Sequence, residues 1–178
     1  AKKEVKSTDF VSTNDLLTAA WGRMSKARLM EMAINFRGRL PGIEQDDAGN
    51  YEGAIVFSGD DFQDPGSIRK ALQRKDGFLK STLDPPKPLP GFCELRKCRY
   101  RMITSWASFA KDLALGEARQ LLHLPYFNLG EVPADFMVIF KPTASTLAVM
   151  ILTRKLDDAT LKGKDSLFGE SVLPEPLK

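Results

Sequence analysis

Large apolar residues alternate with polar or small residues through the segment 28–37. The apolar members of this alternation are Met30, Met32, Ile34 and Phe36. Side chains two positions apart lie on the same face of a β-strand, so the pattern predicts a strand with one buried face. Gly38 and the pair Pro41-Gly42 follow it and are typical of turns, so we expect the strand to end before them.

The polar residues at the end of this strand are candidates for a binding site. Asn35, Arg37 and Arg39 follow one another at every second position. In one interpretation the arginines form ion pairs inside the protein, which is the commoner use of such residues. In the other, the strand end binds an anion or a cofactor. The residues alone leave both interpretations open.

Similar patterns predict four further strands and helices over 13–26, 64–75, 93–100 and 156–161. A helix is expected over 13–26, because residues 12–15 offer N-caps and apolar residues recur after them at helical spacing. A second helix is expected over 64–75, with a proline in its first turn. The further strands are expected over 51–57, 102–106, 135–140 and 147–153. A short turn separates the last two, which are expected to pair as an antiparallel hairpin.

Length and composition fit one domain. The chain has 178 residues and is 43% hydrophobic, which allows a substantial core. We expect a loose segment over 1–9, a domain over 10–165 and an extended tail over 166–178. Four prolines in the segment 84–91 predict a stiff connector. The expected fold class is α+β with two layers, a mixed and largely antiparallel sheet with helices packed on it.

Charge and motifs exclude several classes of function. The net charge of +3 gives little support for a nucleic-acid partner, and basic clusters such as 96–101 suit either a solvated face or an acidic partner. No apolar run reaches the roughly 18 residues that a membrane helix needs. Phosphate-cradling loops and G-x-S-x-G are absent. The single histidine and the two cysteines, Cys93 and Cys98, lack metal-ligand spacing, so we expect no metal; we interpret the cysteines as reduced thiols, with a disulfide left open.

Four segments, taken in order, resemble a known superfamily. They are 12–21, which runs from Ser-Thr-Asn-Asp to Trp; 33–40, with Asn-x-Arg-x-Arg-Leu; 49–51, Gly-Asn-Tyr; and 104–106, Thr-Ser-Trp, followed later by Asp135-Phe136. They resemble the C-terminal half of the CoA-dependent acyltransferases: plant-type BAHD acyltransferases, chloramphenicol acetyltransferase and condensation domains. The resemblance covers about residues 10–165. It implies a chloramphenicol-acetyltransferase-like half-fold, with CoA as the cofactor if the family activity is retained.

The family's catalytic motif is missing from this chain. In the family, a histidine of H-x-x-x-D, from the N-terminal half, takes the proton from the acceptor alcohol or amine. His123 is the single histidine here, and Phe127 stands four positions after it. A lone histidine without an orienting carboxylate is more often structural. We therefore interpret His123 as a partly buried structural residue and expect no catalytic residue in the chain.

The resemblance also implies an ion pair. The family's DFGWG motif begins with an aspartate that pairs with an arginine of the strand. Asp135 stands at the matching place, although Met-Val-Ile replaces Gly-Trp-Gly over 137–139. The resemblance thus implies that Asp135 pairs with Arg37 or Arg39, while Asn35, Arg37 and Arg39 are the candidates for contact with CoA or another anion.

Three functions follow as expectations. The first is a non-catalytic, acyltransferase-like scaffold or accessory subunit of a larger assembly, with other protein subunits as partners. The second is one half of an acyltransferase whose catalytic histidine lies on another segment or chain. The third is a module that binds acyl-CoA or a similar anion. We expect an intracellular protein, of a plastid or mitochondrion if a targeting segment was removed before Ala1, that can lie beside a membrane complex.

Overall fold

The computed structural model describes residues 10–39, 41–73, 99–109, 113–126 and 135–153. Its elements in chain order are α1 (Thr13–Met24), β1 (Leu29–Asn35), β2 (Glu52–Ser58), the 3-10 helix η2 (Asp61–Gln63), α2 (Pro65–Gln73), β3 (Tyr100–Ser105), β4 (Ala114–Leu115), β5 (Ala118–Arg119), β6 (Asp135–Thr143) and β7 (Thr146–Leu152). The expected segment 1–9, the proline-rich connector 84–91, both cysteines and the tail 166–178 lie outside the described residues.

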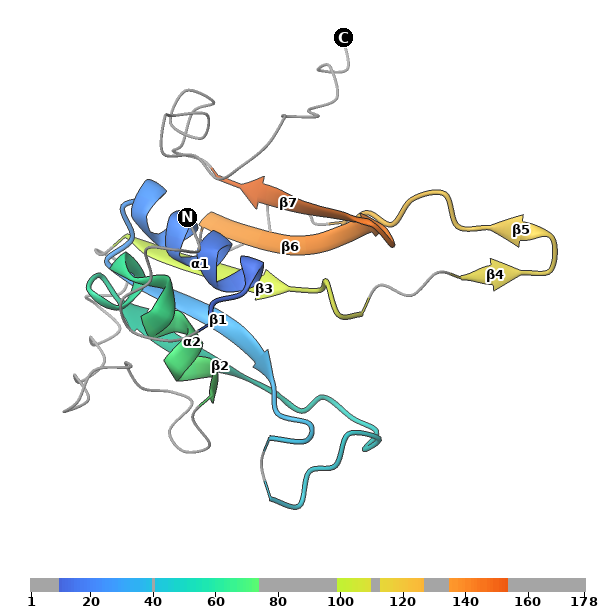
Figure 1. Ribbon diagram of the computed structural model, residues 1–178, viewed down its shortest axis with the longest axis horizontal. Helices are drawn as coiled ribbons and strands as arrows, with labels where there is room; N and C mark the ends of the chain where they lie inside the picture. The colour runs from blue at the N-terminus through green and yellow to red at the C-terminus, as the bar shows by residue number, and fades with distance from the viewer. Residues whose placement is uncertain (1–9, 40, 74–98, 110–112, 127–134, 154–178) are drawn as a thin grey trace, which may run out of the picture.

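Five strands form one mixed sheet in the order β2-β1-β3-β6-β7 (Figure 1). The three central strands run parallel to one another, and each outer strand is antiparallel to its neighbour. β4 and β5 form a separate antiparallel pair. The expected fold class, α+β with a mixed sheet and helices packed on it, is confirmed.

The start of α1 is fixed by a capping box. The Ser12 side chain accepts a hydrogen bond from the backbone N–H of Asp15, and the Asp15 carboxylate accepts one from the backbone N–H of Ser12. This reciprocal arrangement satisfies two N–H groups that an uncapped helix would leave without partners. The helix then buries Leu17 and Trp21 against the sheet, and the Trp21 indole donates to the backbone oxygen of Met102 at 3.2 Å.

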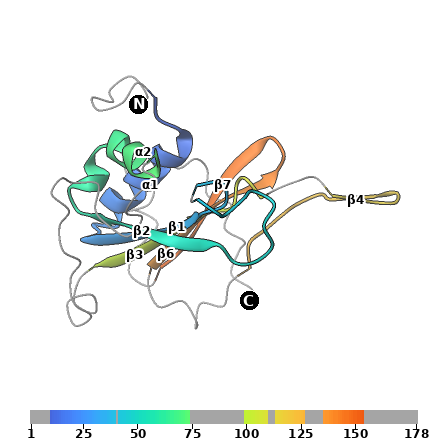
Figure 2. The ribbon, with the colours of Figure 1, turned by 90° about the horizontal axis from the view of Figure 1, so that it is seen from below.

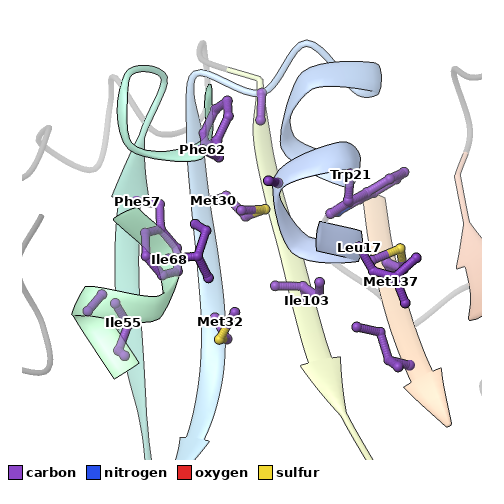
Figure 3. Packing of buried hydrophobic residues seen from close by; sticks show 14 of the residues in the cluster. Leu17, Trp21, Met30, Met32, Ile55, Phe57, Phe62, Ile68, Ile103 and Met137 are labelled. Atoms are coloured by element: carbon purple, nitrogen blue, oxygen red, sulfur yellow. The ribbon is translucent and has the colours of Figure 1, made fainter. Parts of the chain in front are cut away.

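The core lies between the two helices and one face of the sheet (Figure 2). Met30, Met32 and Ile34 are buried, which confirms the alternation expected for β1. Trp21 from α1 and Ile68 from α2 both lie over the strands in Figure 3. The hydrophobic effect is proportional to the apolar area removed from water, so this layer of contacts contributes substantially to the stability of the described fold.

The sequence predicts most of the described elements within a few residues of their observed bounds. The helix expected over 13–26 ends at Met24, and the hairpin expected over 135–140 and 147–153 is observed as β6 and β7. The β4–β5 pair was not expected, and Tyr100, expected to end a helix, begins β3. The rest of the helix expected over 93–100, apart from residue 99, and the helix expected over 156–161 lie outside the described residues. No described helix is both long enough and apolar enough to cross a membrane.

Candidate protein-interaction surface

Arg37 holds the loop between β1 and β2 together. Its Nε donates to the backbone oxygen of Asp47 at 2.8 Å, its Nη2 donates to that of Gly49, and its Nη1 donates to Asn35 Oδ1 at 3.3 Å. The guanidinium also lies over the Tyr51 ring, 5.1 Å from its centroid. Three of the five N–H groups of the guanidinium are therefore used inside the protein.

Arg39 connects the same loop to α2. Its Nη1 donates to the backbone oxygen of Leu72 at 3.3 Å, in the last turn of that helix. A cation is favoured there, because the helix dipole places partial negative charge at the C-terminal end. Partial burial, and secondly the positive charge of Arg69, lower the pKa of Arg39 from its ordinary value. Asn35, Arg37 and Arg39 thus stand at the predicted strand end, with structural partners.

Asp135 pairs with a different arginine from the one expected. Its Oδ2 lies 3.2 Å from Nη2 of Arg101, and both side chains are buried. The two residues are neighbours at the starts of the parallel strands β6 and β3, and Arg101 is level with Met30 at the start of β1. Arg37 follows the opposite end of β1, about 23 Å along the strand at a rise of roughly 3.3 Å per residue. The expected pair of Asp135 with Arg37 or Arg39 is therefore wrong.

A second buried ion pair was not expected from the sequence. Asp15 is fully buried, and its Oδ2 accepts from Nε and Nη2 of Arg69 at 2.8 and 2.6 Å. The pair joins the start of α1 to α2. The Ser-x-x-Asp spacing over 12–15 signals the cap, but no local pattern signals a partner 54 residues away.

His123 is half-buried, and its backbone N–H donates to the oxygen of Pro142 at 2.9 Å. This bond connects the segment around His123 to β6. Among the described residues, no group of three or more His, Cys, Asp or Glu side chains is arranged to hold a metal ion.

A shallow hollow lies on the face of the sheet opposite the helices. Its volume is about 200 Å³, and its lining residues are Glu31, Ala33, Glu52, Met102, Ile103, Thr104, Trp106 and Phe136. The Glu31 carboxylate accepts a hydrogen bond from the Tyr100 hydroxyl. Two carboxylates and no basic side chain line the hollow, so its electrostatics disfavour a phosphate-bearing ligand such as CoA.

An arm projects from the sheet between β3 and β6 (Figure 1). We define the arm as residues 106–109 and 113–126. Its outer part is the β4–β5 hairpin, whose two-residue loop begins with Gly116 at φ +61°. Type II′ turns require a positive φ at this position. The backbone N–H of Gln120 donates to the oxygen of Leu113 at 3.1 Å and extends the pairing toward the sheet.

The arm exposes large apolar side chains. The exposed residues are Phe109, Leu113, Leu121, Leu122, Leu124 and Tyr126. They are six of the eight large hydrophobic residues that are exposed in the described part of the chain, and Leu121 and Tyr126 are 88% and 91% exposed. Single exposed apolar residues are ordinary, but a group on one projecting segment is typical of a surface that another molecule covers.

Comparison with family models, with curated proteins and with solved structures finds no match to this chain.

Proposed function

We propose that this chain is a non-catalytic accessory or scaffold subunit that docks onto another protein subunit through its arm. The observation that carries the proposal is the concentration of exposed apolar side chains on the arm. Burying them is favourable by about 25 cal/mol per Å² of apolar area. The arm extends away from the sheet, so a partner can contact it from more than one side (Figure 1).

A protein partner suits the arm better than a lipid bilayer. Residues 120–126 form neither helix nor strand, so apart from the N–H groups of Gln120 and His123 their backbone groups are not held in a ladder. In hydrocarbon, each backbone group without a partner costs several kcal/mol, whereas a protein surface supplies donors and acceptors. The hairpin also carries exposed Glu117 and Arg119, which suit a polar rim around an apolar contact.

The two other functions that the resemblance implies have less support. An acyl-CoA site at the strand end would need free donors, and Arg37 uses three of its own on Asn35, Asp47 and Gly49. An acyltransferase half would need a base on a different segment or chain, and no observation on the described residues favours that arrangement over docking.

The test is to isolate the tagged chain from its native cells, at native abundance, with the arm intact or altered. The arm variant is L121S/L122S/L124S. The control is Phe10→Ser, which changes an exposed large apolar residue outside the arm. We expect the wild-type chain and the control to co-purify in constant stoichiometry with the same subunits, and the arm variant to elute as the free chain.

Three outcomes would overturn the proposal. One is an arm variant that keeps its partners. The second is transfer of an acetyl group from acetyl-CoA to an alcohol or amine by the purified complex, whether or not the arm variant keeps this activity. The third is sedimentation of the wild-type chain, but not the arm variant, with neutral phosphatidylcholine vesicles, because the arm would then bind lipid.

A further inference from the structure

β7 is an edge strand with no charged residue. Its sequence is Thr-Leu-Ala-Val-Met-Ile-Leu over residues 146–152, and it pairs with β6 on one side. In the described part of the chain, no strand pairs with its other side (Figure 1). Leu147 is 39% exposed, and residues 148–151 are half-buried. Among the described residues, this apolar edge therefore has no strand partner along its length.

This edge lacks the features that protect edge strands from pairing. Such strands usually carry lysine, proline, an inward charge or a bulge. The outer strand at the opposite side of the sheet, β2, begins with Glu52 and Gly53. In β7, by contrast, five consecutive residues from Ala148 to Leu152 pair with β6 in regular register, and the only shift in that pairing lies between Phe140 and Thr143.

We propose that two copies of this chain pair β7 with β7, antiparallel, about a two-fold axis at Val149. The two five-stranded sheets then form one continuous sheet. Val149 faces Val149 of the second copy, Ala148 faces Met150, and Leu147 faces Ile151. The interface is isologous, so each contact occurs twice and the assembly closes as a dimer.

Symmetry restricts the register. A two-fold axis perpendicular to the sheet keeps each side chain on its own face of the sheet. Residues that face each other across the interface must therefore lie on the same face. This holds only if the axis lies between a residue and the same residue of the second copy. Ala148 and Met150 lie on the face opposite the helices, while Val149 and Ile151 pack against the core on the helix side. Of the possible centres, Val149 alone uses the whole strand, because it is the middle residue of Thr146–Leu152.

Side-chain size and charge fit the same register. With the axis at Val149, each Met150 faces the small Ala148, and Leu152 faces the short Thr146. With the axis at Met150, two methionines would face each other instead. No charged residue occurs in Thr146–Leu152, so pairing with a second copy brings no like charges together. The pairing uses the strand edge and not the arm, and it therefore goes beyond the proposed docking function.

A symmetric cysteine tests the register directly. The background is C93S/C98S, and Val149→Cys is added. Directly opposed residues of an antiparallel pair have Cα atoms about 4.5–5.5 Å apart, within the range that a disulfide spans. The control, Leu147→Cys, would lie about 13 Å from its own symmetry mate along the strand. We expect mild oxidation to cross-link the Val149→Cys chain nearly completely and the Leu147→Cys chain scarcely at all. Equal cross-linking, or none at Val149→Cys, would overturn the proposal.

Charge placement gives a second test, read by sedimentation velocity. In the full chain, A148K/M150K places lysine opposite lysine, whereas A148E/M150K places glutamate opposite lysine. We expect wild type and A148E/M150K to sediment at twice the monomer mass of 19.8 kDa, and A148K/M150K at the monomer mass. Far-ultraviolet circular dichroism shows whether each variant is folded. The β7 interface would be contradicted if wild type is a monomer or if A148K/M150K is a dimer. It would also be contradicted if the dimer is lost in the arm variant L121S/L122S/L124S.

Discussion

Asp135 and Arg101 form a buried ion pair between neighbouring parallel strands, with 3.2 Å between Oδ2 and Nη2. Arg101 makes two further contacts. Its Nη1 donates to the backbone oxygen of Tyr100 at 2.9 Å, and its Nη2 donates to that of Ser25 at 3.2 Å. Ser25 caps the C-terminus of α1. The guanidinium therefore connects the first helix to the starts of β3 and β6.

Removing the acid of this pair should destabilise the fold. Asp135→Ala leaves a buried guanidinium without its counter-charge, and we expect a loss of about 3–5 kcal/mol in the free energy of unfolding. The double variant R101M/D135L removes both charges and should lose less than Asp135→Ala alone. Urea denaturation measures both. A near-neutral Asp135→Ala would show that the pair contributes little to the fold.

The pair between Asp15 and Arg69 should behave similarly at the other side of the core. Arg69→Met leaves the fully buried Asp15 with the two donors of Ser12, at 2.6 and 2.9 Å. We expect a loss of about 3 kcal/mol, the lower end for a broken buried pair, because these donors remain. The control Ser12→Ala removes the side-chain cap and the hydroxyl donor to Asp15 but keeps the ion pair, and should cost about 1 kcal/mol by urea denaturation. Equal losses in the two variants would mean that the ion pair with Arg69 contributes no more to stability than the N-cap does.

The sequence predicts features that depend on residues close together in the chain. It misses features that depend on the order of the strands in the sheet. Period-two burial in β1 and the N-cap of α1 are encoded within a few residues, so both were predicted. The partner of Asp135 depends on β3 lying between β1 and β6, an order that no local pattern encodes. The arm was missed because β4 and β5 have two residues each, too few for a periodic signal.

Gly22 should resist a substitution that usually stabilises helices. Glycine in a helix costs about 0.5–1 kcal/mol relative to alanine. A Cβ at Gly22, however, would lie 2.5 Å from Cγ of Phe62, whose ring is buried. We expect Gly22→Ala to lose about 1–3 kcal/mol through overpacking. The control Gly59→Ala would place its Cβ no closer than 4.0 Å to Ala27 O and should be nearly neutral. A gain in thermal stability for Gly22→Ala would show that the ring moves aside freely.

Arg37 distinguishes a loop clamp from an anion site, because the two roles respond differently to lysine. As a clamp, the guanidinium needs several donors in fixed directions, to Asn35, Asp47 and Gly49. Lysine keeps the charge but lacks this planar fork. As an anion site, the position needs mainly positive charge. Arg37→Lys should therefore resemble Arg37→Ala if the clamp is the role, and wild type if anion binding is.

The measurement is cleavage of the native protein after Glu44, an exposed residue of the same loop, by a glutamate-specific protease. Losing these hydrogen bonds lowers the cost of opening the loop by about 1–3 kcal/mol, which makes cleavage roughly 5-fold to 150-fold faster when cleavage tracks opening. We expect this acceleration in both Arg37→Ala and Arg37→Lys. Titration of CoA into each variant provides the opposing readout. The clamp would be contradicted if cleavage rates stay unchanged while CoA binds to Arg37→Lys but not to Arg37→Ala. That result would show that the strand end binds an anion.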